Sequence, residues 1–332
     1  MVALPRGGEP SPVEQLVRRD RLRWYELLPW IVALAAFFLL PDYLELGTRV
    51  LNTLLFALSL DLILGYAGIV TLGHAAFFGL GAYTAGILGA RGWSEPISGL
   101  IAAGGLAGLL GLVSGVVILR TRGLTLLMLT LAILFMLQEA ANKAGFLTGG
   151  ADGLQGVTID PILGVFSFDL FGRTAYLYCL IVLFLGWFLA RRIVHSPFGR
   201  SLTGIRENVV RMHAIGADVR RRLITIYTIA AAMAGVAGGL LAQTTQFAAL
   251  SWVSFEMSGA ILIMLILGGS GRLYGAFIGV PLYMILQDVL SRLDPAYWFG
   301  WIGVLLIAVV MFARGGILGL GDRLLTALRR RA

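Results

Sequence analysis

The chain has 332 residues, of which 58% are hydrophobic and 13% are charged, and its mean hydropathy is +0.87. This composition excludes an ordinary soluble domain and predicts an all-α integral membrane protein with many spans. The net charge of +8 comes mostly from arginines that flank apolar runs and are not interleaved with stacking aromatic residues. No nucleic-acid partner is therefore expected.

Residues 1–26 form an expected polar N-terminal segment in the cytoplasm. Four arginines, at positions 18, 19, 21 and 23, lie near its end. No small-residue cleavage site follows them, so the segment differs from a secretory signal peptide. The first apolar helix is therefore expected to be retained.

Ten stretches of the chain are candidates for membrane helices, which need about 20 mainly apolar residues. Together they predict a membrane domain over residues 27–313. Eight or nine spans are the alternative, because several connections are very short, and 72–90 has a second interpretation as a re-entrant segment. The ten expected spans are 27–45, 50–70, 72–90, 96–119, 123–143, 175–193, 223–246, 254–270, 273–292 and 297–313.

The distribution of charge predicts the orientation of these spans. With the N-terminus inside, most of the 26 basic residues fall on one side, including those of the loop 194–222 and of the basic tail 314–332. Because cytoplasmic loops carry the excess of Arg and Lys, both termini are expected in the cytoplasm. The loop 144–174 then lies outside, and the expected polar residues of the outer face are Glu139, Asn142, Asp152 and Glu256.

Polar residues within apolar spans need a physical reason. Asp61 falls near the middle of the expected span 50–70, where a charge costs about 2.5–3.5 kcal/mol, and no arginine is expected at a comparable depth. Two explanations stay open: Asp61 hydrogen-bonds backbone freed by Gly65 and Gly68, or these residues line a translocation path. His74 has the same two interpretations, as a packing residue or as part of the path.

Glycine is spaced in two informative ways. The pattern Leu-Ile-Leu-Gly-x-x-Gly occurs at Leu62–Gly68 and again at Leu265–Gly271, which is either an internal repeat or a chance match. Glycine pairs at four-residue spacing allow helices to cross closely. These pairs are Gly104/Gly108, Gly111/Gly115, Gly235/Gly239 and Gly275/Gly279.

The loop 194–222 is the longest charged segment between apolar spans. A helix is expected over Ser201–Ile215, with Leu202, Ile205, Val209 and Met212 forming an apolar stripe, and Gly216 is expected to end it. Such a helix either lies on anionic membrane lipid through its arginines or docks into a groove of a cytoplasmic partner.

Catalytic chemistry has no candidate in this sequence. There is no Gly-x-x-x-x-Gly-Lys-Ser/Thr phosphate loop, no HExxH motif, no triad candidate and no cluster of side chains at metal-ligand spacing. The single cysteine, Cys179, allows no internal disulfide. We therefore expect a protein that is not an enzyme, with no catalytic residue, no bound metal and no cofactor of its own.

Several segments resemble a known family. The stretch from Arg206-Glu207-Asn208 to Ala214-Ile215-Gly216 is similar to the coupling motif of ABC-importer permeases. The ranges 64–83, 147–156, 196–202 and 230–239 resemble branched-chain amino-acid permeases, and the LivM-type subunit most closely. The chain departs from that family at Arg211-Met212, where a pair of small residues is usual, and at Ile69, where a polar residue is frequent.

The resemblance implies a permease subunit of an ATP-driven importer in a bacterial inner membrane. Branched-chain or other hydrophobic amino acids are the implied cargo, with urea, amides and aromatic acids still open. The implied partners are a second permease, two cytoplasmic ATPases that bind ATP, and an external binding protein. The residues implied to couple to the ATPase are Leu202, Ile205, Arg206, Glu207, Val209, Met212, Ala214, Ile215 and Gly216.

Two other functions remain as alternatives. A gradient-driven secondary transporter would use Asp61 as its coupling site, because an acid within a span is a common ion or proton site. A structural or lipid-interacting membrane subunit would use the loop 194–222 only as a surface anchor.

Overall fold

The computed structural model describes residues 27–162, 164, 166, 172–295, 297–312, 316, 317 and 319. The expected N-terminal segment 1–26 and nearly all of the tail 314–332 lie outside this part. The chain divides into two compact units, Met1–Pro41 and Asp42–Ala332. In the first unit the described helix is α2, Leu28–Leu39, an apolar helix with no buried residue.

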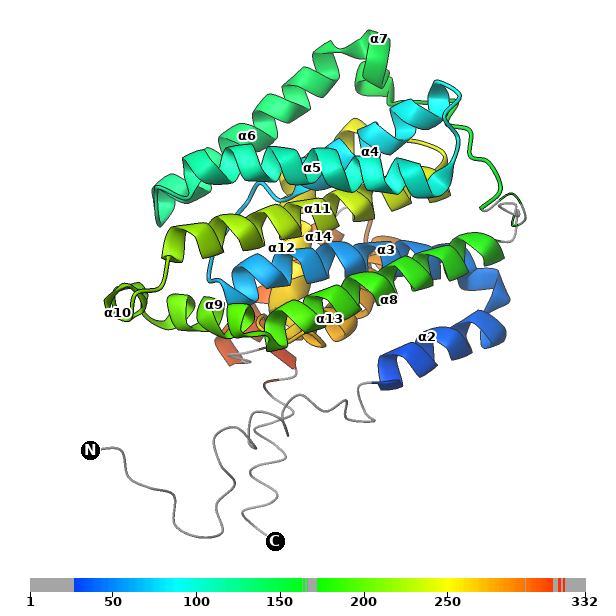
Figure 1. The fold of residues 1–332 in the computed structure, drawn as a ribbon. Helices are drawn as coiled ribbons and strands as arrows, with labels where there is room; N and C mark the ends of the chain where they lie inside the picture. Colours follow the sequence, from blue (N-terminus) through cyan, green and yellow to red (C-terminus); the bar gives the residue numbers. More distant parts are fainter. Residues whose placement is uncertain are drawn as a thin grey trace, which may run out of the picture. The chain divides into compact units, whose positions relative to one another are not determined.

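The second unit is built from long helices that run back and forth (Figure 1). Short helices and turns join them: α7 (Gly145–Thr148), α9 (Pro197–Glu207) and α10 (Val209–Ala214). The longer helices are α3 (Leu44–Asp61, continued by a π-helical segment Leu62–Tyr66), α4 (Ala75–Ala90), α5 (Pro96–Ile118), α6 (Leu124–Lys143), α8 (Arg173–His195), α11 (Val219–Thr245), α12 (Phe255–Gly268), α13 (Gly275–Leu293) and α14 (Trp298–Phe312).

The helices confirm an all-α, multi-pass membrane protein. In the described residues six helical stretches are long and apolar enough to cross a membrane, and α2, α4 and α12 are shorter apolar helices. The 16 residues of α4 span about 24 Å, less than the roughly 30 Å of a hydrocarbon core. The six long stretches are Pro41–Tyr66, Pro96–Ile118, Leu124–Lys143, Arg173–His195, Val219–Thr245 and Gly275–Leu293.

The expected boundary between the first two spans is wrong. Residues 46–49 do not connect two spans but lie within α3. The α-helix is interrupted earlier, between the end of α2 at Leu39 and the start of α3 at Leu44. Pro41 explains the break, because proline disfavours helical backbone at the residue before it. Within α3, Arg49 and Glu45 lie one turn apart and form an ion pair, which is compatible with a helix at these polar positions. The shift places Asp61 near the end of its helical stretch rather than in the middle.

Helix α11 packs closely against α4 and α5, as the glycine spacing predicts. A Cβ atom at Gly104 would lie 2.8 Å from the side chain of Val236, and one at Gly235 would lie 2.7 Å from the carbonyl oxygen of Ala103. Gly238 meets the backbone of Phe78 in the same way. The expected close crossings of α5 with α11 are therefore confirmed, and Gly275 and Gly279 form a similar contact with α12.

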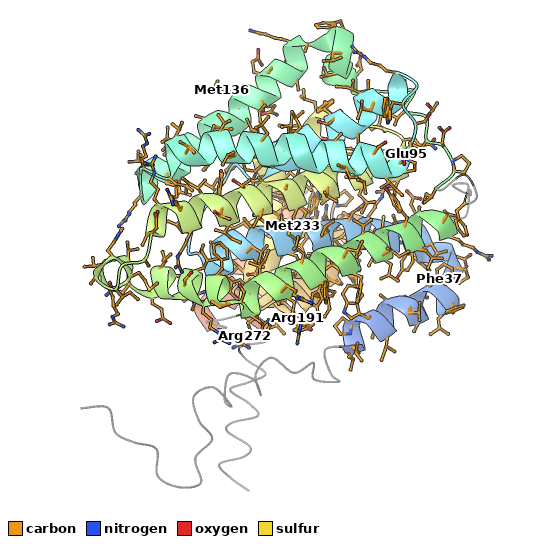
Figure 2. All side chains as sticks on the ribbon, in the orientation of Figure 1. Phe37, Glu95, Met136, Arg191, Met233 and Arg272 are labelled. Carbon is orange, nitrogen blue, oxygen red and sulfur yellow. The ribbon has the colours of Figure 1, made fainter. Side chains whose placement is uncertain are left out.

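The connections gather at two opposite ends of this unit. At one end, Gly153 lies against Phe247, and the Gln243 side chain donates to the Pro96 carbonyl oxygen over 2.8 Å. At the other end, α9 lies beside the π-helical segment that follows α3, and α10 packs against α9 and α11 (Figure 1). Figure 2 shows Glu95 toward the first end and Arg272 toward the second. Antiparallel spans produce this arrangement.

Candidate coupling site

The segment 196–218 folds as two helices, so the expectation of one helix over Ser201–Ile215 is wrong. Helix α9 begins at Pro197 because the Ser196 hydroxyl caps it, accepting a hydrogen bond from the Gly199 N–H over 3.2 Å. Asn208 then has an extended backbone and caps α10, accepting from the Arg211 N–H over 2.9 Å. An asparagine in this position competes with the helical backbone, which explains the break.

The apolar stripe of this segment faces the protein itself. Leu202 and Ile205 are 1% and 2% exposed, and Met212 is half-buried with its sulfur beside Gly204. The side chains that remain open to a partner lie mostly on α10 and just after it, where Val210 and Ile215 are 77% and 70% exposed. The stripe therefore fixes the segment in place, and its opposite face is exposed. Among the expected coupling residues, the exposed ones are Arg206, Glu207, Ala214, Ile215 and Gly216, whereas Val209 is half-buried.

The end of α10 confirms the expectation that Gly216 ends a helix. The Gly216 N–H donates to the His213 carbonyl oxygen and the Ala217 N–H to that of Met212, each over 3.0 Å. This pair of bonds is a Schellman motif, which requires a left-handed residue, and the φ of Gly216 is +80°. Helix α11 follows, capped by Asp218, which accepts from the Arg221 N–H over 3.1 Å.

Asp61 binds backbone from a distant part of the chain. Its side chain is fully buried, and Oδ1 accepts a hydrogen bond from the Gly271 N–H over 2.7 Å. Gly271 belongs to the irregular turn between α12 and α13, where backbone N–H groups have no helical partner. Oδ2 of Asp61 has no hydrogen-bond partner among the described residues. Asp61 therefore binds free backbone, as the first of the two explanations expects, but the backbone is that of Gly271 and not that freed by Gly65 and Gly68.

The two copies of the Leu-Ile-Leu-Gly-x-x-Gly pattern meet in the structure. A Cβ atom at Gly65 would lie 2.7 Å from the Cα of Gly271, so no larger residue fits between the two turns. Gly68 and Gly271 have φ values of +72° and +78°, which favour glycine. We call Asp61, Gly65, Gly68 and Gly271 the glycine junction.

Arg206 reaches this junction from the cytoplasmic segment expected by sequence. Its Nη1 donates a hydrogen bond to the Gly65 carbonyl oxygen. That oxygen belongs to the last turn before the chain leaves the helix, where carbonyl groups lack helical partners and a cation is electrostatically favoured. The Arg206 stem crosses Gly68, where a Cβ atom would lie 2.7 Å from its Cγ. An arginine that the expected topology places in a loop therefore binds the chain one helical turn from Asp61.

His74 has the surroundings of a packing residue. It is 1% exposed, its Nε2 lies 2.8 Å from the Ser59 hydroxyl, and its ring stacks on Phe56 with centroids 5.4 Å apart. It precedes α4, whose first N–H group, that of Ala75, donates to the Ser258 hydroxyl over 3.0 Å. Buried side chains thus satisfy the irregular backbone here too.

The expected polar residues of the outer face lie at the opposite end of the unit. All four are exposed, and Glu139 forms an ion pair with Lys143 at 3.2 Å. The turn at Gly150, two residues before Asp152, packs against the end of α6, where a Cβ atom at Gly150 would lie 3.2 Å from the Asn142 carbonyl oxygen. Glu256 begins α12. No group of three or more metal-ligating side chains occurs in the part of the chain that the structure describes.

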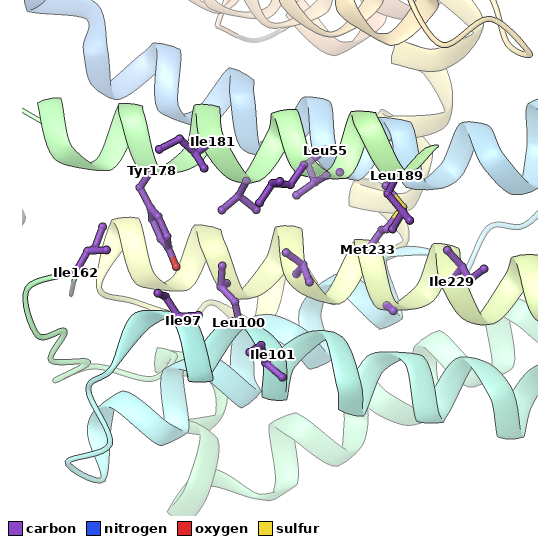
Figure 3. A pocket seen from close by; sticks show the side chains of 15 residues that line it. Leu55, Ile97, Leu100, Ile101, Ile162, Tyr178, Ile181, Leu189, Ile229 and Met233 are labelled. Carbon is purple, nitrogen blue, oxygen red and sulfur yellow. The ribbon is translucent and has the colours of Figure 1, made fainter. Parts of the chain in front are cut away.

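A large groove runs between α8, α5 and α11 (Figure 3). Its volume is about 700 Å³, and none of its lining residues is charged. Tyr178 points across it toward α11, where its hydroxyl donates to Oε1 of Gln243 over 3.0 Å. The charged amino and carboxylate groups of an amino acid need polar partners when they leave water. The groove therefore lacks the chemistry to hold an amino acid.

Sequence reasoning missed Gly271 as a site residue. The pattern repeated at Leu265–Gly271 was the available signal, since Gly271 corresponds to Gly68 of the first copy. Ser258 and Thr130 were also missed: their hydroxyls accept from the Ala75 and Leu72 N–H groups over 3.0 and 3.4 Å. A lone hydroxyl in an apolar run carries no signal that identifies its partner.

Comparisons with known proteins agree on one family. Residues 43–313 match the model of the branched-chain amino acid transport system permease component. The high-affinity branched-chain amino acid transport system permease protein LivM of Escherichia coli is 25% identical over 300 residues, covering 82% of this chain and 69% of the relative. No solved structure matches the chain.

Two further relatives show the breadth of this likeness. A probable branched-chain amino acid transport permease protein LivM of Methanocaldococcus jannaschii is 27% identical over 306 residues, or 77% of this chain and 85% of the relative. The L-arabinose ABC transporter permease protein AraH of Azospirillum brasilense is 26% identical over 329 residues, or 93% of this chain and 90% of the relative.

Proposed function

Because this chain belongs to the family of branched-chain amino acid transport system permease components, we propose that it carries branched-chain or other hydrophobic amino acids across a bacterial inner membrane. It would do so as the permease subunit of an importer whose separate subunits bind and hydrolyse ATP. Transport components rather than enzymes make up its relatives. The further proposed partners are a second permease and an external binding protein.

One observation carries the coupling part of the proposal: the segment 196–218 has one face fixed to the membrane helices and the other face exposed. Leu202 and Ile205 are buried, while Val210 and Ile215 are open. A surface of this kind can dock into a groove of a partner while remaining attached to the spans. The proposed contacts with the ATPase are therefore Glu207, Ala214, Ile215 and Gly216, together with the rest of α10.

The proposed orientation places this segment and both termini in the cytoplasm. The arginines of the segment, of the turn before α6 and of the turn at Arg272 then share one side, as the positive-inside tendency requires. The expected membrane domain 27–313 keeps its limits in this proposal. Helix α6 buries only Leu126, Thr130 and Leu134, so its remaining faces are available to membrane lipid or to the second permease.

The choice of cargo rests on the likeness to the LivM proteins. AraH, which aligns with 93% of this chain against 82% for LivM of Escherichia coli, is named as an L-arabinose transporter permease. Likeness of the membrane subunit alone therefore does not fix the cargo. In the proposed complex the external binding protein supplies most of the selection between amino acids.

The test begins with the complex itself. We would tag this chain, extract it in mild detergent from its native membrane and measure the mass of the intact complex. We expect co-purifying ATPase subunits and, after reconstitution with the binding protein, uptake of radiolabelled leucine that depends on ATP. A chain recovered alone, under conditions that preserve a control importer, would contradict the proposal.

A substitution at Gly216 tests the coupling segment. Valine at Gly216 strains the left-handed backbone, and no other atom lies within 4 Å of its Cβ position, so the effect comes from the turn alone. We expect Gly216→Val to abolish ATP-driven uptake while the protein still inserts in the membrane. Gly105→Val is the matched control, because Gly105 also has open space and has an ordinary φ. Wild-type uptake by Gly216→Val would remove the coupling assignment.

Gradient-driven transport is the second proposed function, and the unpartnered Oδ2 of Asp61 favours it. It predicts leucine uptake into vesicles that contain this chain alone, driven by an ion or proton gradient and lost in Asp61→Asn. Under the ATP-driven proposal the same variant retains uptake, since the asparagine oxygen still accepts from the Gly271 N–H.

A further inference from the structure

Arg206 is part of the exposed segment 196–218 in the sequence, but its side chain contacts the membrane helices. It lies in the last turn of α9, two residues before the break at Asn208. Its neighbours Glu207 and Asn208 are exposed, and α10 follows immediately. Its guanidinium, however, donates to the Gly65 carbonyl oxygen at the end of the helical stretch that begins with α3.

The same guanidinium also lies beside the turn between α12 and α13. A Cβ atom at Gly271 would lie 2.9 Å from Nη1 of Arg206 and 3.0 Å from the Gly65 carbonyl oxygen. The Gly271 N–H is held in turn by Asp61, which lies one turn before Gly65. One side chain of the segment thus touches both turns of the glycine junction.

We propose that Arg206 is a positioning residue that transmits movement of the segment 196–218 to the glycine junction, and so to α3, α12 and α13 together. The inference rests on the proposed function as an ATP-driven permease. It assigns Arg206 to a contact within this chain, in place of the contact with the ATPase that its sequence position implies.

The geometry explains why an arginine suits this task. The break at Asn208 makes α10 a separate short helix, so a partner that moves α10 acts on the end of α9, where Arg206 lies. The guanidinium offers five N–H donors on a planar group, whereas lysine offers a single compact ammonium group. Glycine at position 271 leaves room for the guanidinium, and glycine at position 68 leaves room for the stem that carries it to the Gly65 carbonyl oxygen.

The test compares three variants of this chain in the complete importer. Arg206→Ala removes the contact, Arg206→Lys keeps the charge with a different geometry, and Arg200→Ala removes a charge from the same helix. Arg200 is exposed and has no described side-chain hydrogen bond, so it is the matched control. Leucine uptake and ATP hydrolysis would be measured on the same proteoliposomes.

For Arg206→Ala we expect the ratio of leucine imported to ATP hydrolysed to fall about tenfold, the factor associated with loss of one hydrogen bond to a charged group. Assembly and ATP hydrolysis should stay within about twofold of wild type, and Arg206→Lys should recover part of the ratio. An unchanged ratio in Arg206→Ala would overturn the inference, as would a complex that no longer assembles with its ATPase.

A second measurement needs no transport and separates the inference from the proposed function. In the purified chain, amide exchange of the segments 65–69 and 269–273 should rise about tenfold in Arg206→Ala and remain unchanged in Arg200→Ala. Equal exchange in the two variants would overturn the link to the junction. If exchange responds but wild-type proteoliposomes import no leucine with ATP, the proposed cargo or energy source fails and the link stands.

Discussion

Glycine serves two different purposes in two regions of this molecule. Between α11 and its neighbours α4 and α5, glycine removes side chains so that backbones approach each other. At the glycine junction, glycine leaves room for the side chains of Asp61 and Arg206 to reach backbone groups. The first region is held by packing and the second by polar contacts, so equal substitutions should have different consequences in the two regions.

The physical difference is the regularity of the backbone. Helix α11 runs unbroken over Val219–Thr245, so its backbone groups are satisfied internally and only shape matters at its contacts. At the junction two connections interrupt the helices, and side chains must supply the missing partners. A contact between regular helices and a contact between turns lie in one unit, and the proposed coupling acts on the contact between turns.

The largest effect is expected from Gly238→Leu in α11. A Cβ atom there would meet the Phe78 carbonyl oxygen and lie 3.0 Å from the Ala82 nitrogen, and backbone cannot yield as a flexible side chain can. Overpacking of this kind costs about 3 kcal/mol. Detergent-solubilised protein should lose thermal stability and elute as aggregate in size-exclusion chromatography.

The control for Gly238→Leu is Gly105→Leu, since no other atom lies within 4 Å of the Cβ position of Gly105 in α5. If the two variants melt at the same temperature, close approach of α11 to α4 is not what stabilises the first region.

Asp61→Leu should have the next largest effect. It leaves the Gly271 N–H buried without an acceptor, which costs about 1–3 kcal/mol. Asp61→Asn keeps an acceptor oxygen at the same position and should cost less than half as much. Thermal unfolding of both variants, with wild type alongside, measures the difference. Equal stability of the leucine and asparagine variants would show that the carboxylate does not hold the turn.

A smaller effect is expected from Asn208→Ala, which removes the cap of α10. The Asn208 side chain accepts from the Arg211 N–H, and loss of such a cap costs about 1 kcal/mol. Because α10 is exposed, we expect faster amide exchange confined to residues 209–214, with the rest of the unit unchanged. Asn142→Ala on exposed α6 is the matched control, and an equal response of the two variants would argue against capping.

The smallest effect is expected at an exposed ion pair. Glu45 and Arg49 contact each other over 2.8 Å, but their side chains are 82% and 56% exposed. Water screens such a pair, so Glu45→Ala should change stability by no more than about 0.5 kcal/mol. A larger loss of stability in thermal unfolding would show that water does not screen this ion pair.

Local patterns predicted a substantial part of this structure. Continuous apolar runs predicted the all-α membrane architecture, and four-residue glycine spacing predicted the close contacts of α5 with α11. The glycine after α10 was predicted as a helix end because its conformation depends on a few neighbouring residues. Where local rules competed, prediction failed. Residues 46–49 were predicted to be a polar connection, yet the helix is interrupted earlier, at Pro41. In the segment 196–218, Asn208 interrupts an otherwise regular apolar stripe that predicted one helix.

By itself the sequence determined the class of the protein, most of its helices and the charged segment that joins α8 to α11. Tertiary structure alone decided which way that segment faces and what Asp61 binds. The reason is that hydrogen bonds from Arg206 to Gly65 and from Gly271 to Asp61 join residues 141 and 210 positions apart. Periodicity describes one helix at a time, whereas the partner of a buried polar group depends on which distant turn the fold brings beside it.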